Sequence, residues 1–225
     1  IVGIIARNTN PSPVVTAVST TTTRYTHVNT PTFTTSNITT TGAKVTIGTN
    51  SNPSDTTYAI SFTANTVVRD INDTPTISAP PTPNYLQADG TLGSRIIYQT
   101  ASVWADPTVA NLTPVTSYTV QILAKNGDND TTNGTSTSSQ FETLANVGSN
   151  PRVTTSTVSS ITITWDTNSN SSDARYYVTS SSGKIASWIS GNTWTDDGTT
   201  RDGLAASREY SYTIKTKNMG GTETT

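Results

Sequence analysis

Few side chains in this sequence could perform chemistry. The chain has one histidine, His27, and no cysteine. His27 falls in a predicted linker, where we expect an exposed side chain, so the sequence supports neither a Ser-His-Asp triad nor a histidine-rich metal site. The absence of cysteine excludes disulfides and cysteine-based metal or redox sites. We therefore predict that the chain is not an enzyme and binds no cofactor.

An oxygen-rich segment offers a possible cation site. Residues 126–134 read Asn-Gly-Asp-Asn-Asp-Thr-Thr-Asn-Gly and alternate oxygen ligands as calcium loops do, which makes Asp128 and Asp130 candidate calcium ligands. The twelve-residue spacing that ends in glutamate is not present, however. Clusters of Gly, Asn and Asp are also ordinary turn residues, so a plain turn is the competing prediction.

Two other groups of side chains could act on sugars. Asp196 and Asp197, together with Asp202, could supply the paired carboxylates of a glycosidase, although their glycine-containing segment also predicts a solvated turn. Trp188 and Trp194 could form an aromatic platform for a sugar ring. The alternative for both tryptophans is packing within or at the edge of a sheet.

The positions of these residues depend on an internal repeat. Two segments each contain a tryptophan, then a leucine six residues before a tyrosine, then an asparagine eight residues after that tyrosine. They are Trp104, Leu112, Tyr118 and Asn126 in one copy, and Trp194, Leu204, Tyr210 and Asn218 in the other. The first residues, 1–8, align with 119–126. Such self-similarity predicts a modular array, and a start inside a repeat predicts a window from a longer protein.

Each copy of the repeat predicts a β-strand. In the first copy, apolar residues alternate with polar ones from Tyr118 to Ala124, which places Val120 and Ile122 on one face. Tyr212 and Ile214 repeat the alternation after Tyr210, and we expect all these apolar residues to be mostly buried. A basic residue precedes the asparagine of each copy, which predicts one shared structural position; these residues are Arg7, Lys125 and Lys217.

The repeat resembles the second half of a fibronectin type III domain, and the resemblance covers most of the chain. It implies an all-β fold of tandem fibronectin type III-like β-sandwich domains from a bacterial or archaeal surface or secreted protein. Leu112 and Leu204 would close the sandwich base. Tyr118 and Tyr210 would make the tyrosine-corner hydrogen bond to upstream backbone.

The resemblance also implies a buried tryptophan in the second strand of each sandwich. In the second module this residue is Trp165, within Ser160–Asp166. The corresponding run of the first module, Ala43–Gly48, predicts that Gly48 replaces the tryptophan. Trp104 or Phe62 would then fill the space.

Three segments follow from this organisation. Residues 1–29 are predicted to be the last two strands, F and G, of a preceding module. Residues 32–146 form a complete module with a long Pro-rich insert over 72–89, and we expect its strand E near Ile96–Val103. Residues 148–225 form a module that lacks its last strand.

An incomplete second module would leave the edge of strand F without a partner. Such an edge favours pairing with another strand. Either the polypeptide that follows supplies that strand or a neighbouring copy does, in which case Val14–Val18 is the best-patterned donor. We favour the first alternative, because residues 1–8 already match a strand F that belongs to its own sandwich.

Composition limits the class of function. About a third of the residues are Ser or Thr, 32% are hydrophobic and the net charge is −2. The small negative charge argues against nucleic-acid binding, and no apolar run is long enough to span a membrane.

A threonine-rich chain of β-modules is typical of an extracellular or cell-surface protein. We expect a structural or adhesive array in a filament, lattice or other secreted assembly, with neighbouring modules or copies, and also glycans, as candidate partners. The alternative is a set of accessory modules, spacer or carbohydrate-binding, in a secreted polysaccharide-degrading enzyme.

Overall fold

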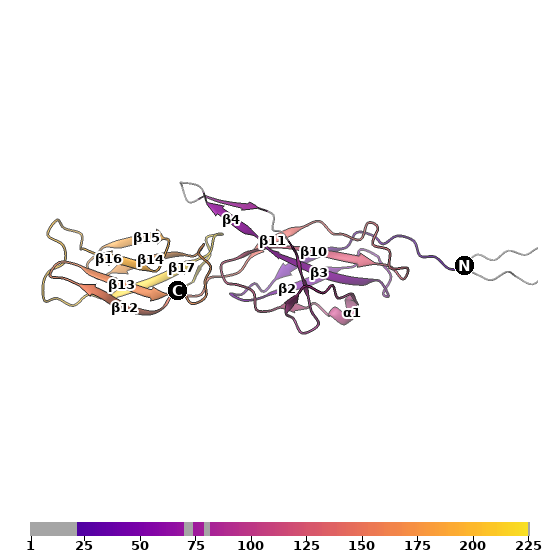
Figure 1. The fold of residues 1–225 in the computed structure, drawn as a ribbon, viewed down its shortest axis with the longest axis horizontal. Helices are drawn as coiled ribbons and strands as arrows, with labels where there is room; N and C mark the ends of the chain where they lie inside the picture. The colour runs from indigo at the N-terminus through magenta and orange to yellow at the C-terminus, as the bar shows by residue number, and fades with distance from the viewer. Residues whose placement is uncertain (1–21, 70–73, 79–81, 225) are drawn as a thin grey trace, which may run out of the picture.

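The chain folds into two β-sandwiches arranged end to end along one axis (Figure 1). The structure, a computed structural model, describes residues 22–69, 74–78 and 82–224. The predicted all-β fold of tandem sandwiches is confirmed, since the only helix among the described residues is the four-residue α1 (Ala101–Trp104). No helix in this described part is long and apolar enough to cross a membrane.

The first sandwich has two antiparallel sheets. One has the strand order β1 (Thr32–Ser36), β2 (Ala43–Gly48), β9 (Thr108–Val109). The other has the order β11 (Ser139–Glu142), β10 (Ser117–Lys125), β3 (Thr57–Ala64), β6 (Asn84–Leu86), β7 (Leu92–Gly93), and β8 (Gln99–Thr100) also pairs with β3. A separate hairpin follows β3 and consists of β4 (Thr66–Arg69) and β5 (Pro75–Ser78).

The second sandwich repeats this plan. One sheet has the order β12 (Ser149–Ser156), β13 (Ile161–Asp166), β16 (Thr193–Asp196), and the other has the order β15 (Ile185–Ile189), β14 (Arg175–Ser180), β17 (Tyr212–Lys217), β18 (Glu223–Thr224). In both sandwiches strands A, B and E therefore face strands C, F and G. Strands B and C are β2 and β3 in the first sandwich and β13 and β14 in the second. Strands E, F and G are β9, β10 and β11 in the first, and β16, β17 and β18 in the second.

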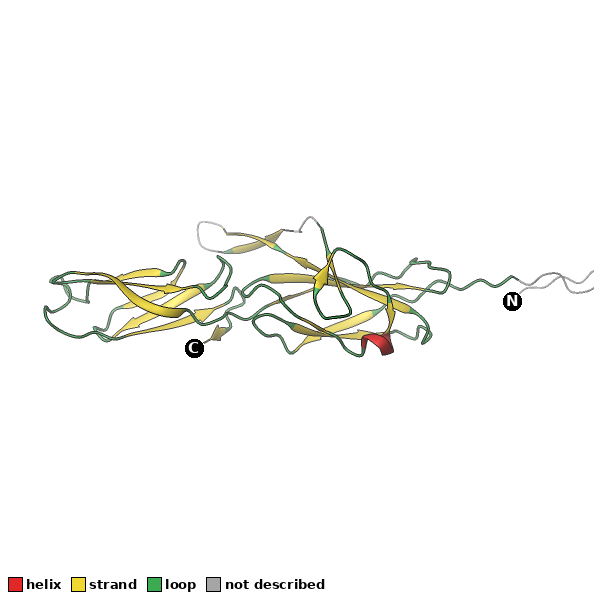
Figure 2. Ribbon diagram, turned by 60° about the horizontal axis from the view of Figure 1, so that its bottom comes forward, coloured by secondary structure: helices red, strands yellow, loops and turns green. Residues whose placement is uncertain are grey.

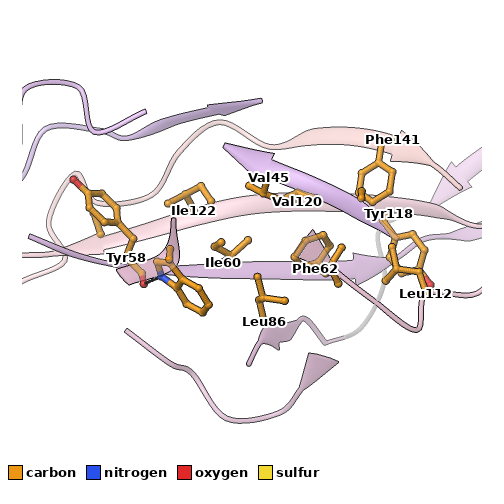
Figure 3. Packing of buried hydrophobic residues seen from close by; sticks show 14 of the residues in the cluster. Val45, Tyr58, Ile60, Phe62, Leu86, Leu112, Tyr118, Val120, Ile122 and Phe141 are labelled. Carbon is orange, nitrogen blue, oxygen red and sulfur yellow. Dashed lines mark hydrogen bonds between the residues drawn. The ribbon is translucent and has the colours of Figure 1, made fainter. Parts of the chain in front are cut away.

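Alternation along the strands builds the core of the first sandwich. Val120, Ile122 and Ala124 of β10 are fully buried, as the alternation predicts. Val120 and Ile122 lie beside Phe62 and Ile60 of the neighbouring strand β3 in the same sheet (Figure 3). Trp104 is also buried, and its Nε1 donates a hydrogen bond of 2.7 Å to the Tyr58 carbonyl. The indole therefore adds apolar area to the core without leaving its polar atom unpaired.

Both predicted tyrosine corners are present. The backbone N–H of Thr113 donates to the Tyr118 hydroxyl at 2.9 Å, and that of Ala205 donates to the Tyr210 hydroxyl at 2.8 Å. Leu112 and Leu204 are buried beside them. Each corner fixes the loop between strands E and F (the E–F loop) against the start of strand F.

The two corners differ in burial, which gives a testable difference. Tyr118 is only 5% exposed, whereas Tyr210 is half-buried. Tyr118→Phe leaves the Thr113 N–H without its partner and should cost about 1–3 kcal/mol of unfolding free energy. Tyr210→Phe should cost less, because water can replace the lost partner. Urea unfolding of both variants checks this, and an equal loss in the two would contradict the role of burial.

The prediction that Gly48 replaces the core tryptophan is wrong by one position. Leu112 N donates to the Thr41 carbonyl, and Leu204 N donates to the Ser159 carbonyl, so Thr41 and Ser159 are equivalent. Counting along strand B from these residues aligns Trp165 with Ile47. The first sandwich therefore has a smaller apolar residue at this position, and Trp104 and Phe62, both buried, contribute to its core as expected.

The predicted place of strand E in the first module is also wrong. It is β9, which pairs with β2 through Ala43 and Val109, and does not lie within Ile96–Val103. In that predicted span, Gln99 and Thr100 pair with β3, and Val103 is an exposed residue of α1. The polypeptide first turns through this short helix to bury Trp104 and only then returns to the opposite sheet.

Two expectations for the second sandwich need correction. Tyr210, Tyr212 and Ile214 are half-buried and not mostly buried, whereas Trp165 is fully buried as predicted. The residues after Asn218 are not too short for a turn and a strand. A turn closed by the hydrogen bond from Asn218 N to the Thr222 carbonyl leads into β18, which pairs with Thr216 and Lys217.

Part of the edge of β17 remains open. In the part of the chain that the structure describes, no strand pairs with Tyr212–Lys215 on the side of β18. The predicted strands within residues 1–21, including the candidate donor Val14–Val18, lie outside the described residues. The source of a longer strand G therefore stays a prediction.

Candidate functional site

The most elaborate polar arrangement in the chain is the joint between the two sandwiches. At this joint the polypeptide that leaves β11 passes Asn146 before it enters β12. Asn146 N donates to Asn170 Oδ1 at 2.8 Å, and Asn170 Nδ2 donates back to the Asn146 carbonyl at 2.7 Å. Asn146 Nδ2 donates to the Asn168 carbonyl at 2.9 Å. A side-chain amide can donate and accept at once, so Asn170 pairs with the linker backbone much as a neighbouring strand would.

The same set of hydrogen bonds, an asparagine clamp between a loop and the linker backbone, holds the segment that enters the first sandwich. Asn29 N donates to Asn52 Oδ1 at 2.7 Å, Asn52 Nδ2 donates to the Asn29 carbonyl at 2.8 Å, and Asn29 Nδ2 donates to the Asn50 carbonyl at 3.1 Å. The two clamps come from loops between strands B and C (B–C loops) that share the tetrapeptide Thr-Asn-Ser-Asn, at 49–52 and 167–170. This repeated tetrapeptide is the sequence signal for the joint, and none of the predictions from the sequence includes it.

The clamp loops have an unusual backbone conformation. Asn50 and Ser51 have φ of 50° and 63°, and Asn168 and Ser169 have φ of 54° and 63°. Asparagine adopts this left-handed region more readily than most residues with a side chain. Two consecutive left-handed residues reverse the loop, and the following asparagine then contacts the linker.

A second clamp comes from the turn between strands F and G (the F–G turn). Asn218 Nδ2 donates to the Thr143 carbonyl at 3.3 Å, while Asn218 Oδ1 accepts from Thr222 N at 2.8 Å. In the first sandwich, Asn126 Nδ2 donates to the Thr26 carbonyl at 2.8 Å. The asparagine eight residues after the repeat tyrosine therefore connects the F–G turn to the incoming segment in both sandwiches.

Glu142 reinforces the second of these contacts. Its two carboxylate oxygens accept from Met219 N and Gly220 N, each at 2.6 Å. Burial raises the pKa of Glu142, and Asp173 raises it further, while the two backbone donors and Arg69 lower it. The net direction is upward, so burial outweighs the favourable contacts of the ionised form.

The raised pKa predicts how the joint depends on pH. A closed joint that raises the pKa of Glu142 binds its proton more tightly than an open joint does. The contribution of Glu142 is therefore fully present below the ordinary glutamate pKa and is lost as the pH rises through the raised value. Unfolding of the second sandwich, followed across this range, should show the decline. Glu142→Gln should remove this decline, and an unchanged decline in that variant would contradict the assignment to Glu142.

An apolar residue of the first sandwich completes the core of the second. Val115, in the E–F loop of the first sandwich, is fully buried and belongs to the apolar cluster that contains Trp165 and Tyr176. The Val115 carbonyl accepts from Ser171 Oγ at 2.6 Å, and the Pro114 carbonyl accepts from Ser171 N at 3.2 Å. Val115 has φ of 54°, which is uncommon for a β-branched residue and indicates local strain.

The β4–β5 hairpin projects from the first sandwich toward the second (Figures 1 and 2) and adds an ion pair at the joint. Arg69, at the end of β4, donates from Nε to Asp173 Oδ1 at 3.1 Å and from Nη2 to the Asp173 carbonyl at 3.3 Å. Their side chains are 17% and 21% exposed. The hairpin, of which only the second strand lies in the Pro-rich insert, therefore connects the first sandwich to the B–C loop of the second.

The candidate calcium ligands Asp128 and Asp130 bind the N-terminal segment of the described chain. Tyr25 N donates to Asp128 Oδ2 at 3.0 Å, and His27 Nδ1 lies 2.5 Å from Asp130 Oδ2. Hydrogen bonds from Thr132, with a smaller effect of His27, lower the pKa of Asp130 to about 2. These aspartates hold the segment 22–29 against the first sandwich. Among the described residues no group of three or more His, Asp or Glu side chains could hold a metal ion.

Of the three candidate glycosidase carboxylates, Asp196 lies apart, whereas Asp197 and Asp202 both line a surface hollow of about 420 Å³. Asp196 is fully buried and accepts hydrogen bonds from Ser180, Ser182 and the Gly198 N–H. Asp197 forms an ion pair with Lys184, and Asp202 is exposed in the loop that follows. Asp196 therefore connects strand E to the turn after strand C.

The aromatic platform is not formed. Trp188 lies on β15 and Trp194 on β16, which belong to opposite sheets. Trp188 packs against Tyr177 with ring centroids 5.3 Å apart, and Trp194 packs against Tyr212 with centroids 6.3 Å apart. The strands that carry the two tryptophans lie in different layers, so the possible platform is excluded. The alternative stated for both residues, packing within or at the edge of a sheet, is confirmed.

The shared position of the basic residues is confirmed for the described pair. Lys125 Nζ lies 4.3 Å from the centre of the Tyr98 ring, and Lys217 Nζ lies 4.3 Å from the centre of the Trp188 ring. Each lysine therefore makes a cation–π contact with an aromatic residue on the same side of its sandwich.

Comparison with known proteins identifies similar folds. No family model and no curated protein matches the chain in sequence. A two-domain fibronectin type III segment of chicken tenascin is similar in structure, with 12% identity, a TM-score of 0.46 and coverage of 84% of this chain and 92% of that one. The FN1–FN3 domains of chicken CNTN1 are 13% identical, with a TM-score of 0.34 and coverage of 89% and 65%. The strand order and the two tyrosine corners, rather than these low scores, establish the fold.

Proposed function

We propose that this chain is a structural or adhesive part of an extracellular module array, within a cell-surface filament, lattice or other secreted assembly of a bacterium or archaeon. The observation that supports the proposal is the joint, which combines two asparagine clamps, a buried valine and an ion pair. Such a joint limits bending between modules, whereas a flexible linker would let them move independently. Restricted bending suits a protein whose task is to span a distance.

The surface of the array supports the same role. Threonines cover the outer faces of the strands, where cross-strand pairs such as Thr162 and Thr195 bond to each other at 2.9 Å. These faces stay hydrated while the β-branched side chains favour the strand. Neighbouring modules or copies of the same protein are the partners that fit such faces, through many weak lateral contacts.

The alternative is a train of spacer modules in a secreted polysaccharide-degrading enzyme. The stiff joint would suit a spacer as well. The carbohydrate-binding version of this alternative loses its main support, because Trp188 and Trp194 lie in opposite sheets. We further propose that the chain has no catalytic activity of its own.

Imaging of the intact native protein tests the function. Antibodies raised against residues 22–224 should label the outside of the producing cell, and negative-stain images should show the label on fibres, a lattice or another extended assembly. Label on isolated secreted particles that degrade polysaccharide would favour the spacer alternative, and label inside the cell would contradict both. Hydrolysis of a glycan, ester or peptide by the purified chain, abolished by one point substitution, would refute the lack of activity.

A further inference from the structure

The end of the first sandwich that points away from the second sandwich carries an incoming segment, a B–C loop and an F–G turn. The end of the second sandwich that faces the joint carries the same three elements. The equivalence follows from the two sets of asparagine clamps, which connect matching residues of the incoming segment, B–C loop and F–G turn. Accordingly, Thr26, Asn29, Asn52, Pro53 and Asp55 correspond to Thr143, Asn146, Asn170, Ser171 and Asp173. The segment 22–29 thus takes the place, relative to the first sandwich, that 139–146 takes relative to the second.

At the joint, these parts receive a neighbouring module. Ser171 binds the loop that carries Val115, and Asp173 binds Arg69 of the hairpin. The equivalent residues of the first sandwich have no such partner among the described residues. Asp55 is exposed and forms no ion pair with any described cation, and it lines a cavity of about 50 Å³ together with Pro53, Val28 and Tyr25.

We propose that this end of the first sandwich, the socket formed by Pro53, Asp55 and the segment 22–29, docks the E–F loop end of another sandwich joined in tandem through that segment. The inference rests on the proposed array function and adds the chemistry of the contact. Asp55 binds an arginine or lysine of that sandwich, as Asp173 binds Arg69. Pro53 has no N–H or hydroxyl to donate, so the incoming loop is held there by apolar contact where Ser171 uses hydrogen bonds.

A chain with a duplicated first sandwich tests the socket. Residues 1–141 are joined directly to residues 25–225, so that Tyr25 takes the place of Glu142 and keeps its own contacts with the second copy. The E–F loop and Arg69 of the first copy then face the socket of the second copy. Spin labels on cysteines introduced at the exposed Thr34 of each copy report the distance between the copies, because the chain has no native cysteine.

We expect a single narrow distance distribution in the duplicated chain. Asp55→Ala in the second copy and Arg69→Ala in the first copy should each broaden the peak, and the double variant should broaden it no further than either single variant, since both break one pair. Asp55 is exposed, so its substitution leaves the fold intact. A broad distance distribution in the duplicated chain without substitutions, or a narrow one that neither substitution changes, would overturn the proposal.

The natural joint in the same duplicated chain is the internal reference. Labels at Thr34 of the second copy and at Ser187 report that joint. A narrow distribution there beside a broad one at the new contact means that the socket proposal alone is wrong. Broad distributions at both contacts mean that the proposed stiff array is wrong as well.

Discussion

Replacement of Trp165 by alanine should destabilise the second sandwich by about 3–5 kcal/mol and leave the first sandwich folded. Trp165 is fully buried, and its ring packs against Tyr176 with centroids 5.3 Å apart. The backbone at Gly148 approaches so closely that an added Cβ would lie 2.7 Å from Trp165 Cδ1. The surrounding groups belong to strands of two sheets and cannot collapse into the space, so the cavity adds to the lost apolar transfer energy.

Urea unfolding that resolves the two sandwiches measures this effect. Trp165→Phe is the matched variant, because it retains much of the apolar volume and removes an Nε1 donor for which no described protein atom accepts. It should cost clearly less than the alanine variant. Trp188→Ala, at a half-buried surface position, should cost less again. A loss below about 1 kcal/mol for Trp165→Ala would show that this residue does not organise the core.

Replacement of Val115 by aspartate should open the joint. The closed joint buries the Val115 side chain completely, so an unpaired carboxylate at this position must either be desolvated or separate the two sandwiches. The expected cost to closure is several kcal/mol, more than one lost hydrogen bond would account for. Backbone preference cannot explain the effect, because aspartate tolerates the left-handed conformation at this position better than valine does.

Ser207 provides a matched control at the opposite end of the second sandwich. It stands three residues before Tyr210, as Val115 stands three residues before Tyr118, and has a similar φ of 56°. Ser207 is exposed, so Ser207→Asp should change little. Spin labels at Thr34 and Ser187 should give a broadened distance distribution in Val115→Asp only. Equal distributions in both variants would contradict the role of Val115 as part of the joint.

The sequence predicts the parts of this fold that depend on local pattern. Alternation along 118–124 predicts strand F, and the spacing of leucine and tyrosine predicts the tyrosine corners, because both depend on residues close together in the chain. Asn126 and Asn218 stand out as repeat positions for the same reason. Their role could not be predicted from local pattern, because each bonds to a carbonyl far away in the sequence. Asn126 bonds to Thr26, 100 residues away, and Asn218 bonds to Thr143, 75 residues away.

The errors come from features that only pairing across the sandwich determines. Strand E of the first module has two residues, too few for a periodic pattern, and its place follows from pairing with β2. The match of Gly48 to Trp165 failed by one residue, and the cross-sandwich bonds of Leu112 and Leu204 correct it. The joint was missed because its signal, Thr-Asn-Ser-Asn, consists of residues that are common in ordinary turns.

Residual dipolar couplings of the backbone amides in the intact chain test the central claim, a stiff joint, most directly. If the clamps at Asn146, Asn170 and Asn218 hold the two sandwiches in one orientation, a single alignment tensor should fit the couplings of both sandwiches. Two tensors of clearly different magnitude would mean that the sandwiches reorient independently. That result would contradict the stiff joint and, with it, the proposed role as a rigid part of an extracellular array.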